Sequence, residues 1–557
     1  MNILVYNVNM KCEQTCNVCQ HLNSINAQLE QLQLAYEQAV KLNEELKIEN
    51  ALQSTEIAWY KEQARLAAYR RFGHSRQSTE GQLALFEFNE AEQHSDPKAE
   101  EPVLQLGEQP KRRQSDKLRK PRRALWEGLP RRVTVHALGE EERVCAVCGE
   151  EMHLMDKEVT VEIEVIPAQF RAHVIERGTY VCDKCAASGV AAPIVTASAP
   201  KRPLEKSLAS ASLLAYIMDL KYSNGMPLNR IANMLRNLDM SISKQNMSNW
   251  VINGAELWLK LIYDELHHQL LQQQIIHSDE THTQVLREPG RSPETKSSMW
   301  LYCSGAHAEG QNIVLYDYQQ TKAAKWPKEF LRGFSGYINV DGAQSYVAAG
   351  LPNTTLVGCW SHARAAFVEA LKAAEPGSVT WNTHTARGIE FCDMLFELER
   401  EYDKLKLSPE ERYRERLIYS KEVLDTFHAW LIHERDKVTP KSKLGQAFTY
   451  CINQWVKLSN FLLDGRLEVS NNRAERLIRP FVVGRKAWLF SDTPRGASSS
   501  AVIYSIIETA KANGLKPFDY LKWLFEVMPN TRLTDENLRS LLPWSAEIPA
   551  SCRFVSD

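Results

Sequence analysis

Five short runs typical of buried β-strands constrain the fold of this chain more than any other feature of its sequence. The runs are residues 274–279, 299–303, 313–316, 336–341 and 355–359, each with an apolar segment, and a helical run at 323–331 separates the third from the fourth. This order predicts an α/β sheet in which the first three strands form an antiparallel meander and the helix crosses over to the fourth.

Two of these strands are expected to end in an aspartate. Asp279 closes the first run and Asp341 closes the fourth. An aspartate in such a place is more often a loop or capping residue, but the matching positions indicate a shared metal site. The strand order with its acids resembles the core of ribonuclease H-like nucleotidyl transferases.

Glu475 is the candidate for a third carboxylate. It lies near the start of an expected helix that Asn471 and Asn472 are able to cap. Two interpretations stay open: a capping box, in which Glu475 reaches back to the amide of Asn472, or a ligand in a two-metal phosphoryl-transfer site. Three arginines surround it at helical spacing: Arg473, Arg476 and Arg479. They either grip DNA phosphate or form ion pairs with neighbouring carboxylates.

A heptad pattern near the start of the chain predicts a coiled coil. Its first positions are Leu22, Leu29, Tyr36, Asn43, Asn50 and Ile57, and its fourth positions are Ile25, Leu32, Ala39, Leu46, Gln53 and Tyr60. A seam of about six heptads exceeds the roughly three to four that support such an assignment. Homodimerisation is the functional interpretation, with the two asparagines of the seam fixing its register. The alternative is an amphipathic helix folded back on its own domain.

Two CxxC pairs predict a structural zinc ribbon. Cys145 and Cys148 precede a run of strict alternation at residues 159–165, and Cys182 and Cys185 follow it. Four thiolates complete a tetrahedral zinc site and leave no position open for substrate. Before the ribbon, residues 111–132 concentrate basic side chains that suit phosphate neutralisation or a solvated linker. Three further cysteines, Cys12, Cys16 and Cys19, have no clear fourth ligand and remain unassigned.

Helical runs at residues 208–220, 226–238 and 243–251 indicate a helix-turn-helix. Ser243 is the expected cap of the last helix. Its exposed face offers side chains that suit phosphates and base edges: Lys244, Gln245, Asn246 and Asn249. Ordinary packing of short helices is the alternative.

The remaining organisation follows from length and pattern. A chain of 557 residues requires several domains. We expect the coiled coil at 1–72, a flexible basic linker at 73–123, the ribbon at 124–200, the helix-turn-helix at 201–262, a catalytic core at 263–369, a helical insertion at 370–460, the glutamate helix at 461–495 and a C-terminal helical region at 496–557. No apolar run approaches the ~18 residues of a membrane span, and no export signal opens the chain, so we expect an intracellular protein.

Together, these motifs resemble the DDE transposases of the insertion-sequence-66 family along nearly the whole chain. The stretches that carry the resemblance are Arg71–Gly73, the CxxC ribbon, the helix-turn-helix, Asp279–Thr281, Asp341–Gly342, Gly358–Arg364, Asn471–Glu475 and Gly484–Phe490.

The resemblance implies a multidomain protein with an α/β ribonuclease H-like core and a catalytic triad of Asp279, Asp341 and Glu475. It implies a bacterial, nucleoid-associated protein of the cytoplasm that cuts and joins double-stranded DNA at transposon ends and targets. The expected metals are Mg²⁺ or Mn²⁺ in the active site and one structural Zn²⁺. The expected partners are a second or further copies of the chain and accessory proteins of the same element.

A CxxH pair, Cys359 and His362, is expected either near the active site or as a packed core pair. Two other functions remain open. One is a non-catalytic regulator that binds DNA through the ribbon, the helix-turn-helix and the zipper. The other is a ribonuclease H-like nuclease without strand transfer.

Overall fold

The computed structural model describes residues 17–72, 170, 172–177, 179–181, 194–196, 198, 201–307, 310–342, 344–374 and 383–554. The chain divides into two compact units, one formed by Met1–Gly73 with Glu176–Asp557 and the other by His74–Ile175. Several expectations lie outside the described residues: the four ribbon cysteines, the strand at 159–165, the basic run at 111–132, and the side chains of Cys12, Cys16 and Cys19.

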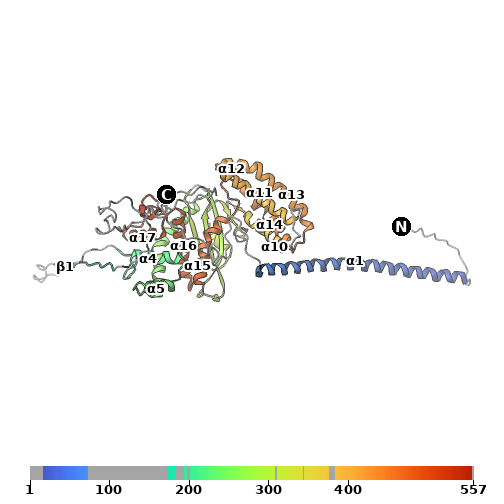
Figure 1. The fold of residues 1–557 in the computed structure, drawn as a ribbon, viewed down its shortest axis with the longest axis horizontal. Helices are drawn as coiled ribbons and strands as arrows, with labels where there is room; N and C mark the ends of the chain where they lie inside the picture. The colour runs from blue at the N-terminus through green and yellow to red at the C-terminus, as the bar shows by residue number, and fades with distance from the viewer. Residues whose placement is uncertain are drawn as a thin grey trace, which may run out of the picture. The chain divides into compact units, whose positions relative to one another are not determined.

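The first described element is α1, a continuous helix of 56 residues at Asn17–Phe72 (Figure 1). At 1.5 Å per residue it is about 84 Å long. Apolar residues of the expected seam are exposed on it, among them Leu29, Leu32 and Ile57 at 53%, 72% and 55%. Among the described side chains of α1, these apolar residues of the seam are not covered by other parts of the chain.

A mixed five-stranded sheet forms the centre of the second part of the chain. Its strands are β3 Ile275–Gln284, β4 Lys296–Ser304, β5 Val314–Gln319, β6 Gly336–Asn339 and β7 Thr354–Val357. They lie in the order β5-β4-β3-β6-β7. β3 pairs antiparallel with β4, and β4 with β5, whereas β6 runs parallel to β3 and to β7. The expected strands and meander are therefore confirmed, as is the intervening helix, α8 Lys325–Phe330.

The edge strand β5 is covered by α16, Pro494–Ala512. Two hydroxyls of this helix replace the missing neighbour strand: Ser505 accepts from the Tyr316 amide at 2.8 Å, and Thr509 accepts from the Val314 amide at 3.0 Å. The open edge of a sheet exposes unpaired backbone amides. This contact gives the amides of β5 hydrogen-bond partners and prevents another strand from pairing with that edge. The next helix, α17 Pro517–Val527, follows the break expected near residue 513.

Short helices precede the sheet. They are α4 Ala211–Tyr222, α5 Leu228–Arg236, α6 Lys244–Gly254, the π-helical turn η3 Ala255–Leu259 and α7 Lys260–Leu271. Ser243 caps α6 as expected, because its hydroxyl accepts from the Asn246 amide at 3.1 Å. A separate pair of strands, β1 Thr179–Val181 and β2 Ile194–Thr196, is antiparallel.

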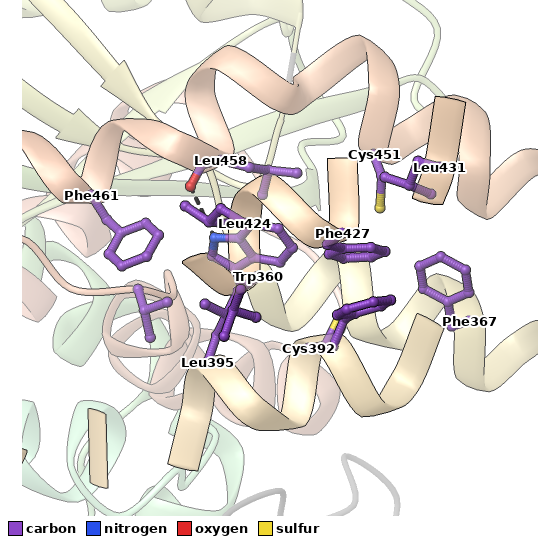
Figure 2. Close-up of a cluster of buried hydrophobic side chains, with 14 of the residues drawn as sticks. Trp360, Phe367, Cys392, Leu395, Leu424, Phe427, Leu431, Cys451, Leu458 and Phe461 are labelled. Carbon is purple, nitrogen blue, oxygen red and sulfur yellow. Dashed lines mark hydrogen bonds between the residues drawn. The ribbon is translucent and has the colours of Figure 1, made fainter. Parts of the chain in front are cut away.

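A helical subdomain interrupts the sheet region after β7. It contains α10 Trp360–Ala373, α11 His384–Lys404, α12 Pro409–Glu415, η4 Arg416–Ser420, α13 Lys421–Glu434, η5 Arg435–Lys437, α14 Lys443–Ser459 and η6 Asn460–Leu463. Figure 2 shows its core, where Trp360 and Phe427 pack together among aliphatic side chains. The indole of Trp360 donates to the Leu458 carbonyl at 2.9 Å.

The two ends of this subdomain meet. The Trp360 amide, at its entrance, donates to the Val469 carbonyl, at its exit, at 3.1 Å. Arg416, which is fully buried, binds Glu399 and also donates to the carbonyls of Phe461, Asp464 and Leu467. The exit segment is therefore held by the helical core before the chain returns to the sheet.

The chain returns as α15, Asn472–Trp488, which packs beside β3 and β4 (Figure 1). The remaining elements are α9 Gln344–Ala349, η7 Met528–Asn530, α18 Asp535–Ser540 and η8 Ala550–Cys552. Among the described residues, no helix combines the length and apolar character that crossing a membrane requires.

Candidate active site

The two aspartates approach each other because β3 and β6 are parallel neighbours. The last paired residues of these strands are His277 and Asn339. Asp279 and Asp341 both follow two positions later, so the register leaves them side by side. One expectation is wrong in detail: β3 does not end at Asp279 but continues to Gln284, because β4 pairs with it along this whole length.

Burial and neighbouring negative charge both act on Asp279. Burial and the carboxylate of Asp341 raise its pKa to about 7, and the carboxylate of Glu475 adds to this effect. A hydrogen bond from the Glu280 amide, 2.8 Å from Oδ1, opposes the rise. The other two predicted acids therefore both act on Asp279 electrostatically, although Glu475 is 196 residues from it in sequence (475 − 279).

Asn471 places the helix that carries Glu475. Its buried side chain donates to the Ser278 carbonyl at 2.8 Å, and its Oδ1 lies 3.1 Å from Nδ1 of His277. The expected capping role is wrong: α15 begins at Asn472 with Asn471 as its N-cap residue, and no side-chain cap is formed there. Glu475 is thus fourth in the helix, beyond the reach of a capping box with Asn472.

Cys359 and His362 lie beside Glu475. Cys359 is fully buried at the N-cap position of α10, and its Sγ accepts from the Asn471 amide at 3.1 Å. One turn later, His362 places Nδ1 3.6 Å from Oε1 of Glu475. A hydrogen bond with Cys359 raises the pKa of His362 to about 9 against the effect of burial, assisted by the charges of Glu475 and Asp341.

The three arginines of α15 differ in their surroundings. Arg473 does not surround Glu475: its Nε donates to the Ser304 carbonyl at 2.7 Å and its Nη2 to Asn312 at 3.1 Å. These two hydrogen bonds account for the position of the Arg473 guanidinium without a bound phosphate or an ion pair. They hold α15 against the end of β4. Arg476 is exposed and Arg479 is half-buried. The Nε of Arg479 has no hydrogen-bond partner among the described residues.

The predicted DNA-reading side chains lie away from the carboxylates, on α6. All four, Lys244, Gln245, Asn246 and Asn249, are exposed. Helix α4 packs against α6. It also contacts the end of α15, since the Lys221 ammonium lies 3.7 Å from the centre of the Trp488 ring. The exposed face of α6 is thus connected through α4 to the helix that carries Glu475.

His277 is a site residue that the sequence did not identify, and its partner is Glu468, the acid that the sequence offers as the alternative to Glu475. Nε2 of His277 lies 2.7 Å from Oε2 of Glu468. Burial opposes ionisation of Glu468, but the His277 imidazole and the Ala306 amide outweigh it and lower its pKa to about 2. The Glu468 carboxylate therefore already binds His277 and the Ala306 amide beside the site, and it does not point to the predicted metal ligands as a free ligand. A lone histidine in an apolar strand gives no signal of such a role.

Comparison with known proteins gives the family context of this geometry. The family model "Transposase IS66 family" matches residues 206–499, and the model "IS66 C-terminal element" matches residues 505–544. The model "zinc-finger binding domain of transposase IS66" matches residues 142–186, which contain all four ribbon cysteines.

Three relatives come from Sinorhizobium fredii (strain NBRC 101917 / NGR234), and each bears the description uncharacterized protein. The chain is 27% identical to y4jD over 73% of its own length and 78% of the relative's. It is 29% identical to y4qI and 26% identical to y4hP, each over 73% of this chain and 74% of the relative. Because the first family model alone spans more than half of its residues, the chain belongs to the IS66 family of transposases.

Proposed function

We propose that the chain is a DDE-type transposase that cuts and joins DNA at the ends of its insertion sequence with divalent metal ions. The observation that carries the proposal is that Asp341, after β6, and Glu475, on α15, both lie close enough to Asp279 on β3 to act on its carboxylate. Burial is the main cause that raises the pKa of Asp279 to about 7, and the charges of Asp341 and Glu475 add to the rise. Clustered carboxylates are costly in a folded protein unless a cation offsets them.

The sheet supports this proposal. Three antiparallel strands followed by two parallel ones, in the order β5-β4-β3-β6-β7, are what a ribonuclease H-like core requires. Such folds host varied chemistry, so the argument for strand cleavage rests on the acids and not on the sheet alone.

The donor set fits divalent ions with a preference for oxygen. We infer that Asp279, Asp341 and Glu475 would hold Mg²⁺ or Mn²⁺, since carboxylates are the usual ligands of both. When bound, two such ions activate the attacking hydroxyl and stabilise the leaving oxygen of a phosphodiester. The side chains of the protein keep the acids in place: Asn471 fixes the start of α15 against β3, and Arg473 fixes it against β4.

DNA contacts are assigned to two regions. Arg476 and Arg479 project from the helix that carries Glu475, and we infer that they contact phosphate near the cut. Lys244, Gln245, Asn246 and Asn249 form an exposed face at the start of α6 that suits sequence reading in a groove. Further parts of the proposal are a zinc ion on the four ribbon cysteines, assembly through α1, and accessory proteins of the same element as partners.

Strand cleavage by the full-length protein tests the proposal. The substrates are labelled duplexes from both ends of the insertion sequence that carries this gene, with and without Mg²⁺. Asp279→Asn, Asp341→Asn and Glu475→Gln should each lower cleavage by orders of magnitude, because each variant forfeits several kcal/mol of transition-state stabilisation. Gel-shift affinity for the same duplexes should persist.

Asp317→Asn serves as the matched control, since Asp317 is a mostly buried aspartate of the same sheet, on β5. It should cleave at the wild-type rate. If Glu475→Gln cleaves at the wild-type rate, Glu475 is not a metal ligand of the site. Cleavage without joining by the wild-type protein would favour a nuclease, and specific binding without any cleavage would favour a regulator.

A further inference from the structure

We propose that Cys359, His362 and Glu475 form a binding site for a transition metal ion of the zinc class, separate from the ribbon. Their potential ligand atoms all lie within 4.8 Å of one another. Among the described residues, no other group of histidine, cysteine, aspartate and glutamate is as tight. The site comes from two elements, the first turn of α10 and the first turn of α15.

The local structure aims these side chains at one point. Cys359 and His362 are three residues apart across the start of α10, so their side chains lie on one face of the helix. The amide of Asn471 donates to Sγ of Cys359, which brings the start of α15, and with it Glu475, against the same face. Nδ1 of His362 has no hydrogen-bond partner among the described residues, although Glu475 lies 3.6 Å away.

The distances suit zinc after a small adjustment. Tetrahedral zinc with ligands at roughly 2.0–2.3 Å places sulfur, nitrogen and oxygen ligand atoms about 3.3–3.6 Å apart. The 3.6 Å between His362 and Glu475 already meets this requirement. The side chains of His362 and Glu475 are 40% and 36% exposed, so both have room to turn towards the buried sulfur and a fourth position faces solvent.

The chemistry of the three ligands differs from that of the two aspartates. Thiolate and imidazole select zinc, cobalt and related ions, whereas carboxylates select Mg²⁺ and Mn²⁺. Glu475 is common to both groups. An ion held by Cys359 and His362 draws Glu475 away from the aspartates. Zinc should therefore inhibit Mg²⁺-dependent cleavage, and this part of the inference rests on the proposed function.

Cobalt spectroscopy on the full-length protein tests the site without reference to activity. The protein is first treated with a mild chelator that leaves the ribbon zinc in place, as metal analysis verifies, and is then titrated with Co²⁺. A thiolate-to-cobalt charge-transfer band should grow to saturation at one further equivalent. It should be absent in Cys359→Ser, and it should weaken in His362→Gln, whose parent side chain is exposed enough that folding is not at risk.

Cys392→Ser is the matched control, because Cys392 is an equally buried cysteine of the neighbouring helical core. It should keep the band. No saturable band in the wild type, or an undiminished band in Cys359→Ser, would overturn the inference.

Zinc inhibition supplies the second readout. Free zinc at low micromolar concentration should inhibit cleavage by the wild type and by Cys392→Ser, and should inhibit residual cleavage by His362→Gln much less. Equal inhibition of all three would show that zinc acts elsewhere. Failure of the proposed function looks different, since it would leave the cobalt band intact while the aspartate variants cleave normally.

Discussion

Asn471 connects three elements of the site with one residue. Its side chain reaches the Ser278 carbonyl and His277 on β3, and its amide reaches Cys359 at the start of α10. The next residue, Asn472, is half-buried, and its Oδ1 has no hydrogen-bond partner among the described residues. The two asparagines are adjacent and identical in type, but their side chains should contribute very different amounts to the free energy of unfolding.

We expect Asn471→Ala to destabilise the protein and Asn472→Ala to have little effect. The first change leaves His277 and the Ser278 carbonyl without their partner in a buried place, at a cost of about 1–3 kcal/mol for each unsatisfied group. Thermal unfolding of both variants by circular dichroism measures the difference. Equal midpoints would mean that the Asn471 contacts contribute nothing. Cleavage should also fall in Asn471→Ala, because Glu475 follows in the next turn.

Asp317 yields a prediction about pH. Burial raises the pKa of Asp317 to about 6 from its ordinary 3.8, although a hydrogen bond from Gln319 opposes the rise. The folded state thus binds more protons than the unfolded state between these values, so this group lowers stability as pH rises from about 4 to 6. Asp317→Asn should raise the unfolding midpoint at pH 7.5 and leave it unchanged at pH 4. A gain at pH 4 as large as that at pH 7.5 would contradict this assignment.

The sequence alone suggests the three acids as candidates, but it does not reveal the residues that hold their helix and strands in position. Asp279, Asp341 and Glu475 each follow a recognisable local pattern, a strand or a helix start. The contact between Asn471 and Ser278 spans 193 residues, and no local pattern reports such a contact. Arg473 was placed near Glu475 by helical spacing alone, and the sheet that it contacts instead is formed by residues far upstream.

At the scale of elements, β5 depends on α16 for its outer hydrogen bonds. The Thr509 hydroxyl accepts from the Val314 amide at 3.0 Å and donates to the Val314 carbonyl at 2.9 Å. We expect Thr509→Val, which keeps the shape, to leave this buried amide unpaired at a cost of about 1–3 kcal/mol. Hydrogen exchange should accelerate in peptides that cover β5.

Ser499→Ala is the control on the same helix. Ser499 is buried, and its hydroxyl donates to the Arg495 carbonyl one turn earlier in α16. Such a bond within one helix adds little to its stability. Exchange in β5 should therefore match the wild type, and acceleration in both variants alike would mean that α16 loosens as a whole.

The sequence predicts which segments of the sheet region are helices or strands, but it predicts the residues at which they end less well. The strands and helices of the sheet region follow their apolar periodicity. The end of β3 does not, because residues 280–284 (ETHTQ) are polar and are held in the sheet by pairing with β4. A propensity argument ends the strand at Asp279, but tertiary pairing extends it.

At the scale of the molecule, α1 exposes a stripe of apolar residues along a helix of 56 residues. We expect the full chain to dimerise through it, because only a second helix buries both sides of such a seam. Removing residues 17–72 should shift the mass in light scattering from dimer to monomer. Replacing Asn43 and Asn50 by leucine should keep the oligomer but alter its order, and an unchanged mass after deletion would place the interface elsewhere.

The helical subdomain that separates Asp341 from Glu475 also determines when the site exists. Synthesis delivers Asp341, the second of the two aspartates, 134 residues before the glutamate (475 − 341). At ~5–20 residues per second this interval lasts roughly 7–27 s. We expect Glu475 to reach the sheet after the helical core has brought Val469 back to Trp360, because the amide of Trp360 binds the Val469 carbonyl in the folded chain. Under the proposed function, a nascent chain that holds only the two aspartates lacks one of the three metal ligands, so we expect the ability to cut DNA to arise only when the chain is nearly complete.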